Sequence, residues 1–349
     1  MPAALPATSP SHASQPDGVD WPTTQWPAGT ASGEVSALVD EAFTDPELAD
    51  TYAVVVVQGG RLLAERYGGA LPSFVNEPTP VTVETPLLSW SMAKSVLHAA
   101  VGLLVDEGRI DPDAPAPVPE WAGPGDPRGA ITLRQLLQMR DGLKWTEDYV
   151  DQTASDVIEM LFGAGSDDVA AFAAAHPLAH APGTRFNYSS GTSNLVARIV
   201  AQTVGPGDAT VAFFRDRLFV PLGMHDATIR LDDAGTFIGS SYVYCSARSF
   251  AKFATLYLRG GAWEGDQLLS RRWVDDAQLP TSADEDPRTY YSHHWWLDGE
   301  GAYWASGYEG QRLVVSPQRD AVLVRLGRTP DDRYPAVRAW CDSVLAALS

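Results

Sequence analysis

The sequence predicts an α/β protein of the α+β type, in which an antiparallel sheet with a five-stranded core is flanked by helices and carries an inserted helical lobe. Three observations indicate this class. Two strand-like segments lie near the start of the 349-residue chain, and three more lie near its end, before a closing helical pattern. The region between them, about residues 85 to 290, is mainly helical and loop-like.

The early segments are a helix and a β-hairpin. A helical pattern covers Val35 to Phe43, and two strand-like runs follow, Tyr52 to Gln58 and Arg61 to Tyr67. Gly59-Gly60 separates the two runs, and two glycines in such a place are a hairpin signal. The hairpin therefore supplies two strands of the predicted sheet.

The late segments are three strands and a helix. Strand-like runs cover Ala302 to Ser306, Gln311 to Ser316 and Ala321 to Leu326, with turn residues between them. A closing helix is expected from about Tyr334 to Leu348. The two early and three late strands are expected to pair into one antiparallel sheet.

The chain divides into a leader, a body and a lobe. Residues 1–30 contain no Lys or Arg and are rich in Pro, Ser, Thr and Ala, so we expect a mobile leader that its two tryptophans could strap down. Residues 31–84 and 291–349 form the sheet body, and residues 85–290 form the mainly helical lobe. A ligand site is expected in the cleft between body and lobe. The clearest periodic stretches of the lobe are Thr132 to Arg140, Ser155 to Phe162 and Asn194 to Val204.

The motif that carries chemistry is Ser91-Met92-Ala93-Lys94, at the start of a helical stretch from Trp90 to Asp106. It puts a hydroxyl and an amine one helical turn apart. The stretch is apolar almost all round, which predicts a buried helix and a buried lysine. Burial lowers a lysine pKa, and a neutral amine can take the proton of a serine nucleophile. The alternative is a first-turn serine beside a lysine that reaches the surface.

The same spacing recurs in Ser249-Phe250-Ala251-Lys252. This copy lies in a stretch whose apolar residues form a one-sided stripe, and Lys252 falls outside that stripe. We therefore expect Ser249 to be an ordinary first-turn residue and Lys252 to be solvated.

Other polar residues are expected to be structural. Ser193 precedes the helical pattern at Asn194 and is predicted to be its N-cap. His98 lies on the same stripe as Ser91, and a core histidine is the favoured interpretation over a base. His293 and His294, beside two tryptophans, could line a site or cap an aromatic cluster.

Composition limits the partners. The 44 acidic and 25 basic residues give a net charge of -19, which disfavours nucleic acid and anionic lipid. The longest apolar stretch, Leu97 to Val105, is too short to span a bilayer. No signal-like segment is present, and Cys245 and Cys341 fit unpaired thiols, so we predict a cytoplasmic protein. No cofactor motif and no metal-binding pattern occurs, since His176 and His180 lack the required context.

Two further segments carry a family resemblance. Tyr188-Ser189-Ser190 follows a Pro-Gly turn, and Ala305-Ser306-Gly307 lies on a late predicted strand. Together with Ser91-Met92-Ala93-Lys94, they make the chain resemble the penicillin-recognising serine hydrolases from about residue 35 onward. The resemblance is to the class C β-lactamase-like group, which includes esterases and nylon-oligomer (aminohexanoate-oligomer) hydrolases. It implies a β-lactamase/transpeptidase-like fold and an acyl-enzyme on Ser91, with Lys94 and Tyr188 moving the proton.

The resemblance also implies residues that bind the substrate. The backbone N–H groups of Ser91 and Tyr308 would form an oxyanion hole, and Gly307 would keep the backbone approachable. Tyr149 corresponds by spacing to a tyrosine of the nylon-oligomer hydrolase branch that contacts the substrate amide nitrogen. Ser190 is expected near the substrate as well.

Two departures from the family pattern narrow the activity. Ala305 stands where relatives carry a Lys or His directed at the substrate carboxylate, and Ser190 replaces the commoner Asn. Both argue against penicillin hydrolysis and cell-wall peptidase activity. The stretch from Trp145 to Thr184 contains seven carboxylates, Asp151 among them, and no Lys or Arg. Such a rim could attract an amine-bearing substrate, or could be a solvated surface.

Three hypotheses follow from the sequence. The first is a cofactor-free serine hydrolase that cleaves small-molecule amides or esters, with linear aminohexanoate oligomers as one substrate class. The second is a carboxylesterase on short acyl esters with the same Ser-Lys-Tyr site. The third is a non-catalytic binding protein that keeps the fold. The sequence does not determine the oligomeric state, and a homodimer is one possibility.

Overall fold

The computed structural model describes residues 5–72, 77–149 and 155–348. Within these ranges, the centre is an antiparallel sheet of eight strands in the order β10-β11-β12-β13-β14-β15-β1-β2. This confirms the predicted class with one antiparallel sheet. The five strands expected from the sequence are its longer members, β1 (Asp50–Gln58), β2 (Arg61–Tyr67), β13 (Tyr303–Gly307), β14 (Gln311–Ser316) and β15 (Ala321–Arg328).

The sheet is wider than the predicted five strands. In the described part of the chain, three short strands extend its edge beyond β13, namely β10 (Ser282–Ala283), β11 (Tyr290–Tyr291) and β12 (Trp296–Leu297). Each spans two residues, which is too short to show the alternation that identifies a strand in a sequence. The five predicted strands are therefore the core of a wider sheet, in which β10 comes from the range assigned to the helical lobe and β11 spans the boundary between lobe and body.

Strand β1 lies inside the sheet and is covered on both faces. It pairs with β15 on one side and β2 on the other, with Val56 opposite Leu323 and Ala64. Val54 and Val56 point into one apolar cluster, whereas Val55 and Val57 point into another. Burial on both faces explains why the strand reads as an unbroken run of valines.

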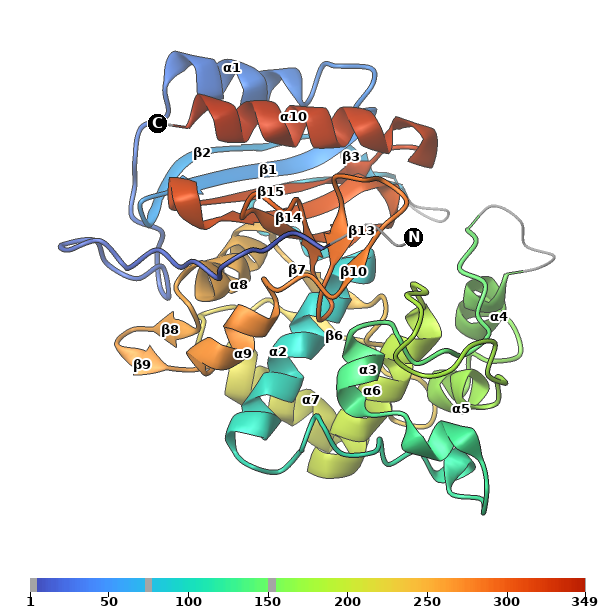
Figure 1. Ribbon diagram of the computed structural model, residues 1–349. Coiled ribbons are helices and arrows are strands. Elements are labelled where there is room, and N and C mark those ends of the chain that lie inside the picture. Colours follow the sequence, from blue (N-terminus) through green and yellow to red (C-terminus); the bar gives the residue numbers. More distant parts are fainter. Residues whose placement is uncertain (1–4, 73–76, 150–154, 349) are drawn as a thin grey trace.

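Two helices cover one face of the sheet. Helices α1 (Gly33–Glu41) and α10 (Tyr334–Ala347) lie side by side above the strands in Figure 1. Val35 of α1 and Val337 of α10 pack into the same apolar cluster as the outer face of β1. Helix α1 begins at Ser32, whose side chain accepts a hydrogen bond from the Val35 N–H at 3.1 Å, an N-cap.

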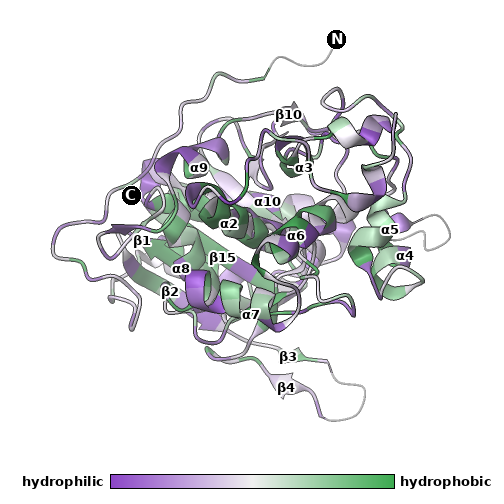
Figure 2. Cartoon of the chain, turned by 90° about the horizontal axis from the view of Figure 1, so that it is seen from below, coloured by the Kyte–Doolittle hydropathy of each residue, from purple (hydrophilic) through white to green (hydrophobic). Residues whose placement is uncertain are grey.

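The helical lobe covers the other face and lies below the sheet in Figure 1. Its central helix is α2 (Ala93–Asp106), which Figure 2 colours as hydrophobic along most of its length. Residues 93–104 of α2 are all buried, as the sequence predicts. The other helices are α3 (Leu133–Leu137), α4 (Asp156–Phe162), α5 (Val169–Ala174), α6 (Ser190–Val204), α7 (Asp208–Phe214), α8 (Ala247–Leu258) and α9 (Arg271–Asp276).

Short elements complete the fold. The short strands are β3 (Ala70–Leu71), β4 (Thr79–Pro80), β5 (Leu87–Leu88), β6 (Thr228–Ile229), β7 (Val243–Cys245), β8 (Ala262–Trp263) and β9 (Asp266–Gln267). The short helical turns are η1 (Trp90–Met92), η2 (Pro119–Trp121), η3 (Pro127–Ala130), η4 (Arg215–Phe219), η5 (Tyr308–Gly310), η6 (Pro317–Arg319) and η7 (Asp331–Arg333). Strand β5 pairs with β7 directly before the Ser91 segment, so this small sheet fixes where η1 begins.

The N-terminal segment lies along the surface of the molecule (Figure 1). The first four residues of the predicted leader are outside the described residues. From there on, the Ala13 N–H donates to the Leu258 carbonyl at 3.1 Å, and the Trp21 ring packs on Trp263 with centroids 5.1 Å apart. Trp26 is buried. Trp21 therefore holds the segment against the lobe, while the chain just after Trp26 pairs with β2 through the Leu62 N–H and the Pro27 carbonyl. Among the described helices, none is long and apolar enough to cross a membrane.

Candidate active site

Ser91 lies in the turn η1, which leads directly into α2. The preceding residue, Trp90, has a φ of 45°, in the left-handed region that bulky L-residues rarely adopt. Its ring is packed edge-on against Tyr308 at 5.6 Å and lies 6.2 Å from the ring of Tyr242. Backbone conformations of this kind cluster at functional sites. Packing on both rings holds the turn that presents Ser91.

Lys94 is buried behind Ser91, with 2% of its surface exposed. Its Nζ donates to Ser91 Oγ at 3.0 Å, to Ser190 Oγ at 3.1 Å and to the Ser240 carbonyl at 3.0 Å. Burial lowers the pKa of Lys94 to about 8, although the charge of Glu147 acts in the opposite direction. The alternative of a lysine that reaches the surface is therefore wrong.

Tyr188 lies beside both Lys94 and Ser91. Lys94 Nζ is 4.9 Å from the centroid of the Tyr188 ring, which stacks on Trp296 at 5.5 Å. Burial raises the pKa of Tyr188 well above its ordinary value, the charge of Glu147 adds to the rise, and a hydrogen bond with Ser91 opposes it. Tyr188 is therefore a protonated phenol in contact with Ser91. It precedes α6, and the residues around it form no regular strand.

Gly307 and Tyr308 close the site from the sheet. Strand β13 ends at Gly307, and a Cβ there would lie 2.3 Å from the carbonyl oxygen of Ser89. Only glycine permits so close an approach. The approach brings the end of β13 beside the segment that leads into η1. Ala305 is buried in the apolar cluster between the sheet and the helical lobe.

A cavity of about 310 Å³ opens in front of Ser91. It contains five of the seven residues predicted for the site, whereas Lys94 and Ser190 lie behind its wall. Tyr149 forms one side, with its ring stacked on Tyr308 at 4.9 Å and 27°. The cavity is lined by Ser91, Glu147, Asp148, Tyr149, Tyr188, Trp296, Ser306, Gly307, Tyr308, Asp331 and Tyr334.

Glu147 has a place in the site that the sequence does not reveal. In the described chain, its carboxylate accepts from Trp145 Nε1 at 2.6 Å, Tyr149 OH at 2.5 Å, the Ser190 N–H at 2.9 Å and Ser190 Oγ at 2.5 Å. In the sequence it counts only as one of seven carboxylates in an acidic stretch. Its spacing of two residues from both Trp145 and Tyr149 is the local signal that could have distinguished it. Another member of that stretch, Asp151, lies outside the described residues.

Ser190 is not in contact with the cavity. It is the first residue of α6 and fully buried, and its hydroxyl lies between Lys94 and Glu147. The prediction that Ser193 caps this helix is wrong. Ser189 is the N-cap, accepting from the Thr192 N–H at 2.9 Å, and Ser193 lies inside the first turns. Helix α6 begins at Ser190, before its apolar periodicity starts at Asn194, and the predicted N-cap is therefore four residues too late.

The second Ser-x-x-Lys segment is structural. Ser249 lies in the first turn of α8, as predicted. The prediction that Lys252 is solvated is wrong, because only 8% of it is exposed. Its Nζ donates to the Thr23 carbonyl at 3.1 Å and the Gly223 carbonyl at 2.7 Å. The N-terminal segment covers a helix face that would otherwise be open.

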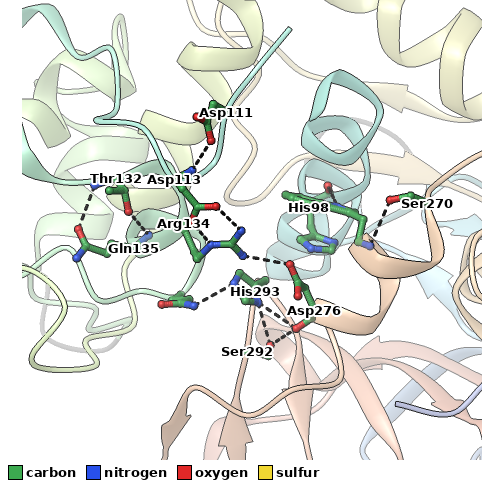
Figure 3. Close-up of polar contacts among 12 residues, drawn as sticks. His98, Asp111, Asp113, Thr132, Arg134, Gln135, Ser270, Asp276, Ser292 and His293 are labelled. Carbon is green, nitrogen blue, oxygen red and sulfur yellow. Dashed lines mark hydrogen bonds and ion pairs between the residues drawn. The ribbon is translucent and has the colours of Figure 1, made fainter. Parts of the chain in front are cut away.

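His98 is a core residue, as the sequence suggests. Its Nδ1 lies 2.7 Å from Tyr257 OH, and its ring stacks on Trp273 at 4.8 Å. Figure 3 shows it near His293 and Asp276, where Arg134 makes an ion pair with Asp276 at 3.1 Å. This network joins α2, α3 and α9. Burial lowers the pKa of His98 well below its ordinary value, so the ring is neutral.

The remaining candidates lie away from the chemistry. His294 Nδ1 lies 3.1 Å from the Lys94 carbonyl, so it supports the helix behind the site instead of lining the cavity. His176 Nε2 lies 3.3 Å from Asp156 Oδ1. Cys245 and Cys341 are buried free thiols. Within the described ranges, no group of three or more His, Cys, Asp or Glu side chains is arranged to hold a metal ion.

A serine with a buried lysine one turn away and a buried tyrosine beside both is a constellation for nucleophilic catalysis. The fold and the sequence both match known proteins. The β-lactamase family model matches residues 41–340. A 6-aminohexanoate-dimer hydrolase of Paenarthrobacter ureafaciens is 31% identical over 312 residues, covering 83% of this chain and 75% of that protein.

Solved structures share the fold. A Bacillus anthracis protein provisionally assigned as a 6-aminohexanoate-dimer hydrolase superposes with a TM-score of 0.74 and 21% identity, over 98% of this chain and 91% of its own. A family VIII carboxylesterase superposes with a TM-score of 0.70 and 17% identity, over 92% of this chain and 98% of its own. The chain belongs to the β-lactamase family. Within that family it is a serine hydrolase of the amidase and esterase kind.

Proposed function

We propose that the protein hydrolyses amide or ester bonds of small molecules through an acyl-enzyme on Ser91. The observation that carries this proposal is the 3.0 Å contact between Lys94 Nζ and Ser91 Oγ in a buried setting. Because burial lowers the pKa of Lys94 to about 8, a substantial share of the amine is neutral near that pH and available as a base.

In the proposed reaction, Ser91 Oγ attacks the carbonyl carbon and its proton passes to the neutral Lys94 amine. The tetrahedral oxyanion is stabilised by the backbone N–H groups of Ser91 and Tyr308. Collapse of the intermediate breaks the bond to the leaving group, which takes a proton relayed from Lys94 through the Tyr188 phenol. Water then attacks the acyl-enzyme, gives its proton to the same pair and releases the acid and free Ser91.

The lining of the cavity supports an amine-bearing substrate. Three carboxylates, Glu147, Asp148 and Asp331, line it together with five aromatic rings, and no Lys or Arg is among the lining residues. Aromatic faces and carboxylates attract cations. We therefore infer that linear aminohexanoate oligomers are a substrate class. The name of the 31% identical relative points in the same direction.

Tyr149 supports an amide in particular. Its hydroxyl hydrogen is donated to Glu147 at 2.5 Å, so the phenol oxygen is left to accept a hydrogen bond. The N–H of a scissile amide could donate to it, whereas an ester has no such hydrogen. A carboxylesterase on short acyl esters is the second candidate function. It uses the same Ser91, Lys94 and Tyr188, and the shared fold with a family VIII carboxylesterase supports it.

The test compares the wild type with Ser91→Ala on two substrates, the linear aminohexanoate dimer and a short p-nitrophenyl ester. Amine release that disappears in the variant supports the amide hydrolase. Hydrolysis of the ester alone moves the assignment to the carboxylesterase. If neither substrate is cleaved and a serine-directed phosphonate fails to label Ser91 in folded protein, the proposal is overturned in favour of a non-catalytic binding protein.

A further inference from the structure

A continuous chain of hydrogen bonds connects the nucleophile with the tyrosine on the substrate side. Lys94 Nζ donates to Ser91 Oγ at 3.0 Å and to Ser190 Oγ at 3.1 Å. Ser190 Oγ donates to Glu147 Oε1 at 2.5 Å, and Tyr149 OH donates to the same oxygen at 2.5 Å. One carboxylate oxygen therefore holds both the base side and the substrate side of the site.

We propose that Glu147 is a positioning residue of the catalytic site, which fixes the Tyr149 phenol at the cavity and keeps Lys94 aligned with Ser91 through Ser190. The proposal rests on the serine hydrolase function proposed above. It adds the residue that couples the two sides of the site. Glu147 acts through its neighbours, since none of its hydrogen bonds goes to Ser91 itself.

On the substrate side, Glu147 holds a loop. The Glu147 carboxylate binds Trp145 Nε1 and Tyr149 OH, which lie two residues before and after it. It also binds the Ser190 N–H at the start of α6. Tyr149 is thereby anchored to a buried helix and stacked on Tyr308 at 4.9 Å. Without this anchor the phenol would be free to leave the cavity wall.

On the base side, Glu147 supplies charge. The titratable groups that face Lys94 are Glu147 through Ser190, Tyr188 at 4.9 Å and His294 beside the Lys94 carbonyl. Burial lowers the pKa of His294 to about 3 and raises that of Tyr188, so both are neutral at pH 7. Glu147 is thus the carboxylate that stabilises the charged form of Lys94 in the described residues.

The titratable groups that face Glu147 are one amine and three phenols. Besides Lys94, they are Tyr149, Tyr188 and Tyr291, and its charge contributes to raising the pKa of all three phenols. All three phenols therefore stay protonated and neutral near pH 7. Removal of the charge should act on Lys94, because no other group in this set changes protonation near neutral pH.

The test uses two substitutions of Glu147 on the full chain. Glu147→Gln removes the charge and keeps one carbonyl oxygen as an acceptor. Its NH2 group would replace the oxygen that accepts from Trp145 Nε1 and the Ser190 N–H, so these two hydrogen bonds are lost. Glu147→Asp keeps the charge and shortens the reach. We expect Glu147→Gln to move the acid limb of the kcat/KM profile to lower pH by about one unit. We expect Glu147→Asp to leave that limb in place and lower kcat.

Two controls isolate the effect. Tyr149→Phe removes a hydrogen bond to Glu147 without removing charge, so the acid limb should not move. Glu159→Gln removes an exposed carboxylate of α4 that does not line the cavity, and its profile should match the wild type. Thermal unfolding of each variant identifies any that fail to fold.

The outcomes separate the two proposals. If the wild type hydrolyses neither the aminohexanoate dimer nor the p-nitrophenyl ester, the proposed function is contradicted. If the wild type is active, two results together overturn the role of Glu147 and leave the proposed function standing. These are an unchanged acid limb in folded Glu147→Gln and an unchanged kcat in Glu147→Asp. A loss of stability without a shift of the limb would mean that Glu147 only ties the loop to α6.

Discussion

Gly307 lies against the backbone of Ser89, so closely that a Cβ at residue 307 would be 2.3 Å from the Ser89 carbonyl oxygen. The contact joins the end of β13 to the segment that carries the nucleophile. Gly307→Ala must push the two segments apart, and the Tyr308 N–H moves with β13. We expect kcat/KM to fall by about a hundredfold, since a displacement of about 1 Å is enough for such a loss.

The control for that substitution is Gly33→Ala in α1, where a Cβ would meet nothing within 4 Å. Steady-state kinetics and thermal unfolding of both variants are compared with the wild type. Normal kcat/KM in Gly307→Ala would show that the oxyanion donors do not depend on this contact.

The activity should depend on the protonation of Lys94. Burial lowers its pKa to about 8, so the amine is increasingly protonated, and unable to act as a base, as the pH falls through 8. We expect kcat/KM to rise with pH through about 8 and then to level off. Tyr188 should cause no alkaline loss in this range, because its pKa is raised well above the ordinary value. A profile measured from pH 6 to 10 that is flat, or that falls with pH, would exclude Lys94 as the base.

Tyr149→Phe should separate amide from ester hydrolysis. The phenol oxygen is proposed to accept a hydrogen bond from the scissile amide N–H, which esters lack. A hydrogen bond of this kind contributes about 0.5 to 1.5 kcal/mol, so amide turnover should fall roughly two- to thirteenfold more than ester turnover. The measurement is kcat/KM on the aminohexanoate dimer and on a p-nitrophenyl ester. Equal losses on both substrates would remove the proposed role of Tyr149.

Lys252 should matter for stability and not for chemistry. Its Nζ binds the carbonyls of Thr23 and Gly223, and Lys252→Met would leave both without this donor. We expect the free energy of unfolding to fall by about 1 to 3 kcal/mol, with kcat/KM unchanged. The matched control is Lys144→Met, at an exposed lysine, which should be neutral in both respects. Loss of activity in folded Lys252→Met would reopen a catalytic role for the second Ser-x-x-Lys segment.

The long elements of the fold could be predicted from the sequence because each carries its own periodic pattern. Strand β1 is a run of valines, β2 follows a two-glycine turn, and α2 is apolar all round. The two-residue edge strands β10, β11 and β12 have no such pattern and depend on pairing with distant segments. Their existence therefore could not be predicted from local sequence.

The candidate site divides in the same way. Ser91 in η1 and Lys94 in α2 lie one turn apart on a continuous helical segment, so their contact follows from helical geometry. Tyr188 and Tyr308 come from other parts of the chain, and only the family resemblance points to them. Glu147 was missed because its function depends on Ser190, which only the fold brings beside it. The burial of Lys252 was missed because the N-terminal segment that covers it is remote in sequence.

The central claim is that Ser91 forms a covalent acyl-enzyme with Lys94 as its base. The most direct measurement is acid quenching of the protein during turnover of p-nitrophenyl acetate, followed by peptide mapping by mass spectrometry. An acetyl group on Ser91 in the wild type, absent from Ser91→Ala and strongly reduced in Lys94→Met, is the predicted result. Burst release of nitrophenol without any acyl group on Ser91, or an acyl group on another residue, would contradict the account.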